Sequence, residues 1–188
     1  IEIRDYVKKS KYFKHVHKGW RTGVDFPTKV QSSSLPAYFL GIWLGDGTAR
    51  NTGITNIDSE IIVYLTEFAE SLNLRVRIED QKDKTNVYHI VSHGFANGRG
   101  GNKVQKALKH LNLIQNKHIP LNYLTGDREQ RLELLAGLID SDGSHNNHGG
   151  YDFINKNEQL VNEFAFLARS LGLAAYITKS RKSCKNFT

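Results

Sequence analysis

"LLAGLIDSDGSH", residues 134–145, passes from aliphatic to acidic residues within a few positions, and "YFLGIWLGDGTA", residues 38–49, shows the same change. The two apolar segments end at Asp46 and Asp142, each followed by glycine. Both segments are expected to be helices that these glycines end. A carboxylate in the last turn of a helix is unfavourable, because that end carries roughly half a negative charge. Each helix end therefore predicts a nearby cation.

A longer internal repeat contains both segments. "NIDSEIIVYLTEFAESLNLRVRI", residues 56–78, resembles "NKNEQLVNEFAFLARSLGLAAYI", residues 155–177, in the same order relative to the Asp-Gly segments. A repeat of this length indicates two related structural units. The identical pairs are Asn56/Asn155, Ala69/Ala168, Ser71/Ser170, Leu72/Leu171 and Leu74/Leu173.

Start and stop signals predict an αββαββα order for one full unit. Ser34 and Asp127 are expected to cap the two apolar helices. A glycine-rich loop precedes the last helix of the first unit. The other expected elements are helices over 58–72, 103–111 and 157–171. Three strands are also expected: one begins at Leu74, one covers 86–93, and one begins at Leu173. We divide the chain into a basic leader (1–34), a first repeat (35–126) and a truncated second repeat (127–188).

Small residues predict that the two apolar helices pack closely. Packed side by side in one direction, the helices would bring both aspartates to one point. Two carboxylates there suit Mg²⁺, which takes one or two protein carboxylates and completes its shell with water and substrate phosphates. Such a site favours phosphodiester hydrolysis; two buried helices with glycine caps and no metal are the alternative. The small residues are Gly41, Gly45, Ala136 and Gly137.

Other metal sites are weaker hypotheses. A calcium loop counted from Asp140 needs Gly at its sixth position and Glu at its twelfth, but the chain has His145 and Tyr151 there. Two histidine pairs lack Cys or carboxylate partners at ligand spacing. These pairs are His15/His17 and His145/His148.

The composition is that of an ordinary globular protein, with 39% apolar and 24% charged residues. No apolar stretch approaches the roughly 20 residues that span a bilayer, so an intracellular location without membrane contact is expected. Cys184 is the single cysteine, which excludes an internal disulfide. The absence of methionine leads us to expect that the chain is processed or is part of a longer one.

Positive charge is concentrated in the leader, which carries eight Lys or Arg against three acidic residues. Interleaved aromatic residues make it a candidate phosphate-backbone contact, with Lys18 and Arg21 as candidate residues. A solvated lysine-rich face is the alternative. In "LRVRIEDQ", Arg75 and Arg77 alternate with apolar residues, which puts both on one face of a strand as DNA contact would require. Weaker DNA-binding candidates are Arg50, Arg99, Lys103, Lys179 and Arg181.

"LAGLIDSDG", residues 135–143, differs at one position from the nonapeptide that names the LAGLIDADG homing endonucleases, and "FLGIWLGDG", residues 39–47, resembles the first-copy motif of the two-motif members. The resemblance covers about residues 35–188 and is strongest to endonuclease domains embedded in inteins. It implies an α+β fold in which two αββαββα units are related by a pseudo-twofold axis within a monomer, here with the second unit incomplete. The motif helices would lie at the interface and the sheets on double-stranded DNA.

The resemblance also implies roles for single residues. Asp46 and Asp142 correspond to the acidic ligands of Mg²⁺, or of Mn²⁺. "NKHIPLNYL", residues 116–124, resembles the stretch whose lysine assists the attacking water or the transition-state charge, which assigns that role to Lys117. The family's second lysine would lie beyond Thr188.

We therefore expect a metal-dependent homing endonuclease domain, whose partner in the parent chain is an intein splicing domain. As given, the chain lacks the terminal residues of self-splicing. Two alternatives stay open: a nucleic-acid-binding module without nuclease activity, such as an RNA maturase or a decayed endonuclease, and a structural insert of a splicing element.

Overall fold

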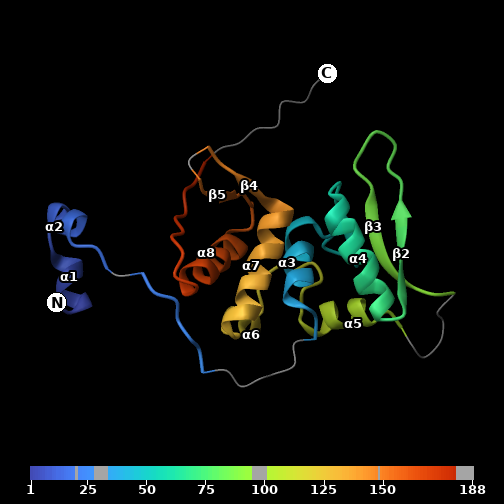
Figure 1. The fold of residues 1–188 in the computed structure, drawn as a ribbon, viewed down its shortest axis with the longest axis horizontal. Helices are drawn as coiled ribbons and strands as arrows, with labels where there is room; N and C mark the ends of the chain where they lie inside the picture. Colours follow the sequence, from blue (N-terminus) through green and yellow to red (C-terminus); the bar gives the residue numbers. More distant parts are fainter. Residues whose placement is uncertain (20, 28–33, 95–100, 148, 181–188) are drawn as a thin grey trace.

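Two helices packed side by side form the centre of the fold (Figure 1). The computed structural model describes residues 1–19, 21–27, 34–94, 101–147 and 149–180. Helix α3 (Ala37–Asp46) ends at Gly47, and α7 (Arg128–Asp142) ends at Gly143, as the sequence predicted. The cap predicted for α7 is also confirmed, because the Asp127 side chain accepts a hydrogen bond from the backbone N–H of Gln130.

Glycine makes the close approach of α3 and α7 possible. A Cβ on Gly41 would lie 2.5 Å from the carbonyl oxygen of Leu134, and one on Gly45 would lie 2.1 Å from Ser141 Oγ. A Cβ on Gly137 would lie 2.3 Å from a carbonyl oxygen of α3. Real side chains do not fit at these distances. The predicted close packing of the two motif helices is confirmed at these three positions.

The predicted cap of α3 at Ser34 is wrong. The N-cap residue of α3 is Pro36, whose side chain makes no capping hydrogen bond. Tyr123 explains the later start, because its hydroxyl donates to the carbonyl oxygen of Leu35 at 2.7 Å and lies 3.1 Å from the Leu35 nitrogen. Both backbone groups of Leu35 are thereby held outside the helix.

The first unit places a sheet and several helices beside α3. Strand β3 is central in an antiparallel sheet of order β1-β3-β2, and α4 covers one face of it (Figure 1). The αββαββα order calls for two strands between α3 and α4, but in this described stretch the structure has only β1 and an isolated bridge between Gly47 and Ile54. The elements are β1 (Gly53–Thr55), α4 (Ser59–Ser71), β2 (Leu74–Glu79), β3 (Val87–Ser92), α5 (Lys103–His110) and α6 (Leu121–Leu124).

The second unit lies on the other side of the central helices (Figure 1). It consists of β4 (Gly143–His145) paired antiparallel with β5 (Tyr151–Phe153), followed by α8 (Glu158–Ser170). The strand predicted to begin at Leu173 is wrong: within the described residues, no strand follows α8. A strand needs a neighbour for its backbone hydrogen bonds, and no counterpart of β3 stands beside this segment among the described residues. The fold is thus α+β, with a second unit shorter than the first.

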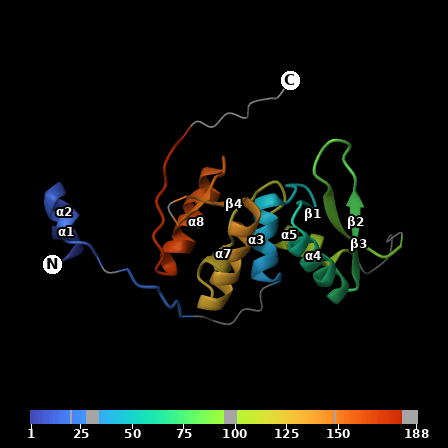
Figure 2. The same ribbon diagram turned by 45° about the horizontal axis from the view of Figure 1, so that its top comes forward.

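Two short helices, α1 (Ile3–Lys8) and α2 (Lys11–Val16), stand apart from this body in both views (Figures 1 and 2). The segment after them returns to the second unit. Arg131, fully buried in α7, donates from Nη2 to the carbonyl oxygen of Val24 at 2.6 Å and from Nη1 to that of Ser170 at 2.9 Å. Arg131 thereby joins the leader, α7 and the end of α8. Among the described helices, none is long and apolar enough to cross a membrane.

Candidate active site

The structure brings Asp46, Asp142 and Lys117 together at the ends of α3 and α7. Burial raises the pKa of Asp46 to about 6; the Asp142 carboxylate also raises it, whereas Asn56 and Lys117 lower it. The three residues lie close together: a Cβ on Gly45, the residue before Asp46, would lie 3.3 Å from Asp142 Cβ, and Lys117 Nζ lies 3.0 Å from the Gly45 carbonyl oxygen. The site therefore contains two carboxylates, one from each unit, and a lysine.

Each carboxylate is held by an asparagine at an equivalent position of the repeat. Asn56 donates from Nδ2 to Asp46 Oδ2 at 2.6 Å, and Asn155 donates from Nδ2 to Asp142 Oδ2 at 3.1 Å. The Asn56 amide lowers the pKa of Asp46 and so opposes the effect of burial. Sequence reasoning did not assign these asparagines to the site, although their identity in the repeat was a signal.

The same asparagines are fixed by the start of the following helix. The Oδ1 atom of Asn56 accepts a hydrogen bond from the backbone N–H of Asp58 at 2.7 Å, and Asn155 Oδ1 accepts one from Asn157 at 3.0 Å. Asp58 and Asn157 in turn cap α4 and α8. Each amide thus connects a helix start to a carboxylate, and the connection is repeated in both units.

Lys117 occupies the C-terminal end of α3. Its Nζ atom donates to the carbonyl oxygens of Leu44 at 2.9 Å and Gly45 at 3.0 Å, and lies 5.4 Å from the centre of the Trp43 ring. A cation is favourable at this end of a helix. Burial lowers the pKa of Lys117 to about 8, against the opposing effect of the two aspartates. The ammonium group has three N–H donors, of which these carbonyls use two.

Residues of the second unit hold the segment that carries Lys117. Asn157 donates from Nδ2 to the Lys117 carbonyl oxygen at 2.7 Å. Ile119, two residues after Lys117, donates from its backbone N–H to Glu163 Oε2 at 2.6 Å. The site therefore depends on both units for its lysine as well as for its carboxylates.

The two carboxylates suit a divalent cation such as Mg²⁺ whose remaining ligands are water and substrate oxygens. No cluster of three or more His, Cys, Asp or Glu that could enclose a metal exists among the described residues. Asp46 and Asp142 each use Oδ2 for an asparagine, and no other described residue is hydrogen-bonded to either Oδ1. Two carboxylates with free oxygens suit Mg²⁺, which keeps water and binds substrate phosphates.

Arg75 and Arg77 are exposed on the same face of β2, as predicted. Neither guanidinium makes an ion pair or a hydrogen bond with another described residue, so both are free to bind phosphates or bases. Lys179 instead forms an ion pair with Glu158 at 3.2 Å. Among the other candidates, Arg50, Lys103 and Lys18 are exposed, whereas Arg99, Arg181 and His148 lie outside the described residues.

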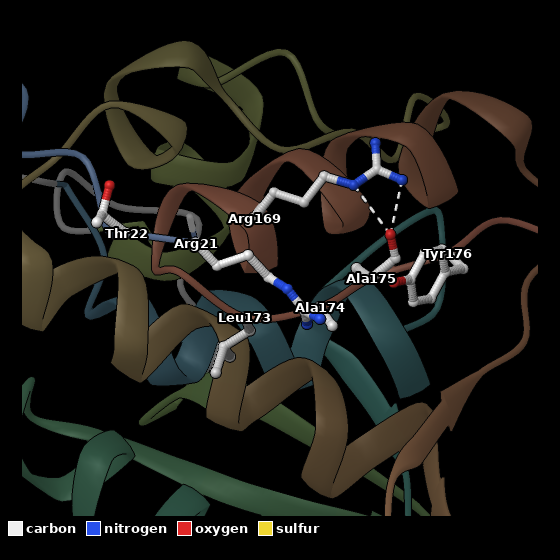
Figure 3. A pocket seen from close by; sticks show the side chains of 7 residues that line it. All are labelled: Arg21, Thr22, Arg169, Leu173, Ala174, Ala175 and Tyr176. Carbon is white, nitrogen blue, oxygen red and sulfur yellow. Dashed lines mark hydrogen bonds between the residues drawn. The ribbon is translucent and has the colours of Figure 1, made fainter. Parts of the chain in front are cut away.

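Arg21 of the leader lines an open hollow beside residues 173–176 (Figure 3). Arg169 of α8 crosses this hollow and donates from Nε and Nη2 to the carbonyl oxygen of Ala175, at 2.9 and 2.7 Å. The structure does not bring Arg21 to the paired carboxylates.

Two family profiles match separate parts of the chain. The homing endonuclease profile matches residues 31–124, half of the chain, and a LAGLIDADG-like domain profile matches residues 129–188.

Similar proteins include the replicative DNA helicase DnaB of Mycobacterium intracellulare, 34% identical over 81% of this chain. The homothallic switching endonuclease of Saccharomyces cerevisiae is 27% identical over 76% of this chain. The chain spans 22% and 28% of the lengths of these relatives.

A solved structure described as mesophilic variants of the homing endonuclease I-DmoI shares the fold, with a TM-score of 0.52 and 15% identity, over 74% of this chain and 78% of that one. The two motif helices, the repeat and the matched profiles all indicate the same family. The chain belongs to the LAGLIDADG homing endonuclease family.

Proposed function

We propose that this chain is the nuclease domain of an intein, which uses Mg²⁺ to make a double-strand break at one long DNA target. The observation that carries the proposal is that Asp46 and Asp142, from the two repeated units, lie at adjoining helix ends beside Lys117. A relative named as a DNA helicase, of which the chain matches 22%, supports the intein context, because an inserted endonuclease domain gives such a partial match.

Asp46 and Asp142 would hold the metal through the oxygens that their asparagines leave free. Mg²⁺, when bound, supplies positive charge at the scissile phosphate. Asn56 and Asn155 fix the two carboxylates in position. Because the two acids come from two units, the site would act on both strands of a duplex that lies across the two units. Mn²⁺ is expected to substitute for Mg²⁺.

Lys117 is the residue suited to act on the attacking water or on the developing negative charge. Its pKa of about 8 leaves it able to give or take a proton near neutral pH. The carbonyl oxygens of Leu44 and Gly45 fix the position of its Nζ. Its third N–H donor remains for the substrate.

The DNA would lie on the face of the β1-β3-β2 sheet that carries Arg75 and Arg77. These two exposed cations neutralise phosphates or reach bases. Within this proposal the chain divides into a leader (1–34), a first repeat (35–126) and a second repeat (127–188), and it acts as a monomer. Arg50, Lys103, Lys18 and Arg21 add positive charge at the edges of the surface.

Cleavage of a defined target tests this proposal. The full-length protein that carries this chain is incubated with Mg²⁺ and a DNA fragment that spans the uninterrupted insertion site of its gene. We expect one double-strand break that requires Mg²⁺ or Mn²⁺. Asp46→Asn, Asp142→Asn and Lys117→Met should each lower the cleavage rate at least about 100-fold.

The exposed Lys109→Met is the matched control for Lys117→Met and should keep most of the activity. Tight, salt-dependent binding without metal-dependent cleavage would favour a binding module instead. Deletion of residues 35–188 tests the structural alternative, since a nuclease insert is dispensable for splicing and a structural insert is not.

A further inference from the structure

We propose that Glu79 is a base-reading residue, held in place by His89 and suited to accept a hydrogen bond from the amino group of cytosine. The inference rests on the proposed function, because it requires the outer face of the first sheet to lie against DNA. We define the outer face as the side of the β1-β3-β2 sheet opposite the core, which carries the side chains of Arg75, Arg77, Glu79 and His89.

The strand register places Glu79 and His89 on the same face. His89 stands directly opposite Arg77, and Glu79 stands opposite the residue two positions before His89. Opposite residues of an antiparallel pair project to the same side, and diagonal neighbours are within reach of long side chains. The other side of the same strands carries core residues such as Leu74 and Ile90. The polar face is therefore the one left for a ligand.

His89 is held too tightly to be an incidental surface residue. It is 8% exposed, and its Nε2 atom lies 2.9 Å from Glu79 Oε2. The ring covers Gly53 of the neighbouring strand, where a Cβ would come within 2.7 Å of His89 Cε1. A ring fixed in this way fixes the carboxylate bonded to it. Glu79 thus loses less side-chain freedom when it binds a ligand than a free glutamate would.

The carboxylate is also not neutralised by the arginines beside it. Arg75 and Arg77 share its strand and face, but the side chain that contacts the Glu79 carboxylate is His89, through Nε2. The Glu79 side chain is 48% exposed, and no described residue is hydrogen-bonded to its Oε1. The outer face therefore presents two free cations and one fixed acceptor in a row.

An acidic group on a DNA-binding surface is repelled by phosphates, so its useful contact is a donor on a base. In the major groove the amino groups of cytosine and adenine are such donors. Adenine places the N7 acceptor beside its amino group, which repels a carboxylate, whereas cytosine does not. Same-face positions on a strand are about 7 Å apart, close to two base-pair steps. Arg77 and Glu79 are thus spaced to read separate base pairs.

Selection of cleavage sites from a partly randomised target tests the inference. The full-length protein and its Glu79→Gln variant are compared on the same library. We expect the wild-type protein to prefer a C·G pair at one position, and the variant to lose that preference by about tenfold or more while its preferences elsewhere persist. His89→Ala should weaken the preference at the same position, because it frees the carboxylate.

Glu70→Gln changes an exposed glutamate of α4, the helix that covers the core side of the sheet, and is the matched control; its profile should equal that of the wild type. Thermal unfolding of each variant confirms that it folds. An unchanged profile for Glu79→Gln, or a uniform gain of affinity for all sequences, would overturn the inference while the proposed function stands. A wild-type protein that selects no sequence would overturn the proposed function, and with it this inference.

Discussion

Asn56 lies with its Nδ2 atom 2.6 Å from Oδ2 of Asp46, and the same arrangement recurs at 3.1 Å between Asn155 and Asp142. Each asparagine also accepts a hydrogen bond from the backbone two residues further on, just before a helix begins. The carboxylates are therefore oriented by the start of α4 and of α8. The orientation of both acids is built into the repeated unit.

Asn56→Ala should weaken metal binding more than it weakens folding. The change removes the donor that offsets the burial of Asp46, so a larger share of that carboxyl is protonated and its orientation is lost. We expect a 10- to 100-fold loss in Mn²⁺ affinity, roughly the effect of losing a partner of a metal ligand. Calorimetric titration in the presence of DNA measures it. Asn162→Ala, on the surface of α8, serves as the control, and equal losses for both variants would contradict the assignment.

The stability of the metal-free protein should depend on pH through Asp46. Its pKa of about 6 in the folded protein lies above the ordinary 3.8, so the folded state binds more protons between these values. The free energy of unfolding should therefore fall as the pH rises from about 4 to about 6. Because the carboxylate is partly exposed, solvent screening limits the effect to about 1 kcal/mol.

Denaturant unfolding of the wild type and of Asp46→Asn at several pH values measures this slope. The variant should lose the decrease, whereas the exposed Asp80→Asn should retain it. A slope that is the same in Asp46→Asn and the wild type would show that another group causes it. Mg²⁺ should restore stability above about pH 6, because only the ionised carboxylate binds metal.

Gly41→Ala should destabilise the fold severely. The added Cβ would lie 2.5 Å from the Leu134 carbonyl oxygen, so α3 and α7 would have to separate. Overpacking of this kind costs about 1–3 kcal/mol or more, and it would also move Asp46 away from Asp142. Thermal unfolding is the measurement. Gly19→Ala, which has open space around it, should change the midpoint little; a comparable loss there would point to a general effect of replacing glycine.

Arg131→Met should release the leader from the second unit. The guanidinium is fully buried and binds backbone carbonyl oxygens of the leader, α8 and the turn before α7. Its loss leaves those carbonyl oxygens without their donor, at a cost of about 1–3 kcal/mol for each buried acceptor left unsatisfied. Limited proteolysis should then cut between residues 17 and 27 faster. Arg4→Met, on the exposed helix α1, should leave the cleavage rate unchanged, and an unaltered rate for Arg131→Met would contradict this role.

The motif helices and their glycine ends followed from the sequence because short-range signals determine them. Asp127 is a typical helix cap, and Gly41 lies where only a glycine lets two helices touch. The meeting of Asp46 with Asp142 depended on recognising the repeat, since no local signal connects residues so far apart.

Other features depend on partners that a linear pattern does not contain. The segment after Leu173 has the alternation of a strand, but no neighbouring strand is present for it among the described residues. The burial of Arg131 and the bond between Asn157 and the Lys117 carbonyl arise from tertiary packing. The asparagines of the site could have been found, because they are identical in the two copies.

The position of a bound metal tests the central claim most directly, namely that the two units build one shared metal site. Anomalous diffraction from Mn²⁺, in crystals of the full-length protein with its DNA target, locates the ion independently of activity. The account predicts a peak at about 2.0–2.3 Å from carboxylate oxygens of both Asp46 and Asp142, with DNA phosphate oxygens in its shell. A peak that contacts neither aspartate, or Mn²⁺ bound elsewhere while DNA is cleaved, would contradict it.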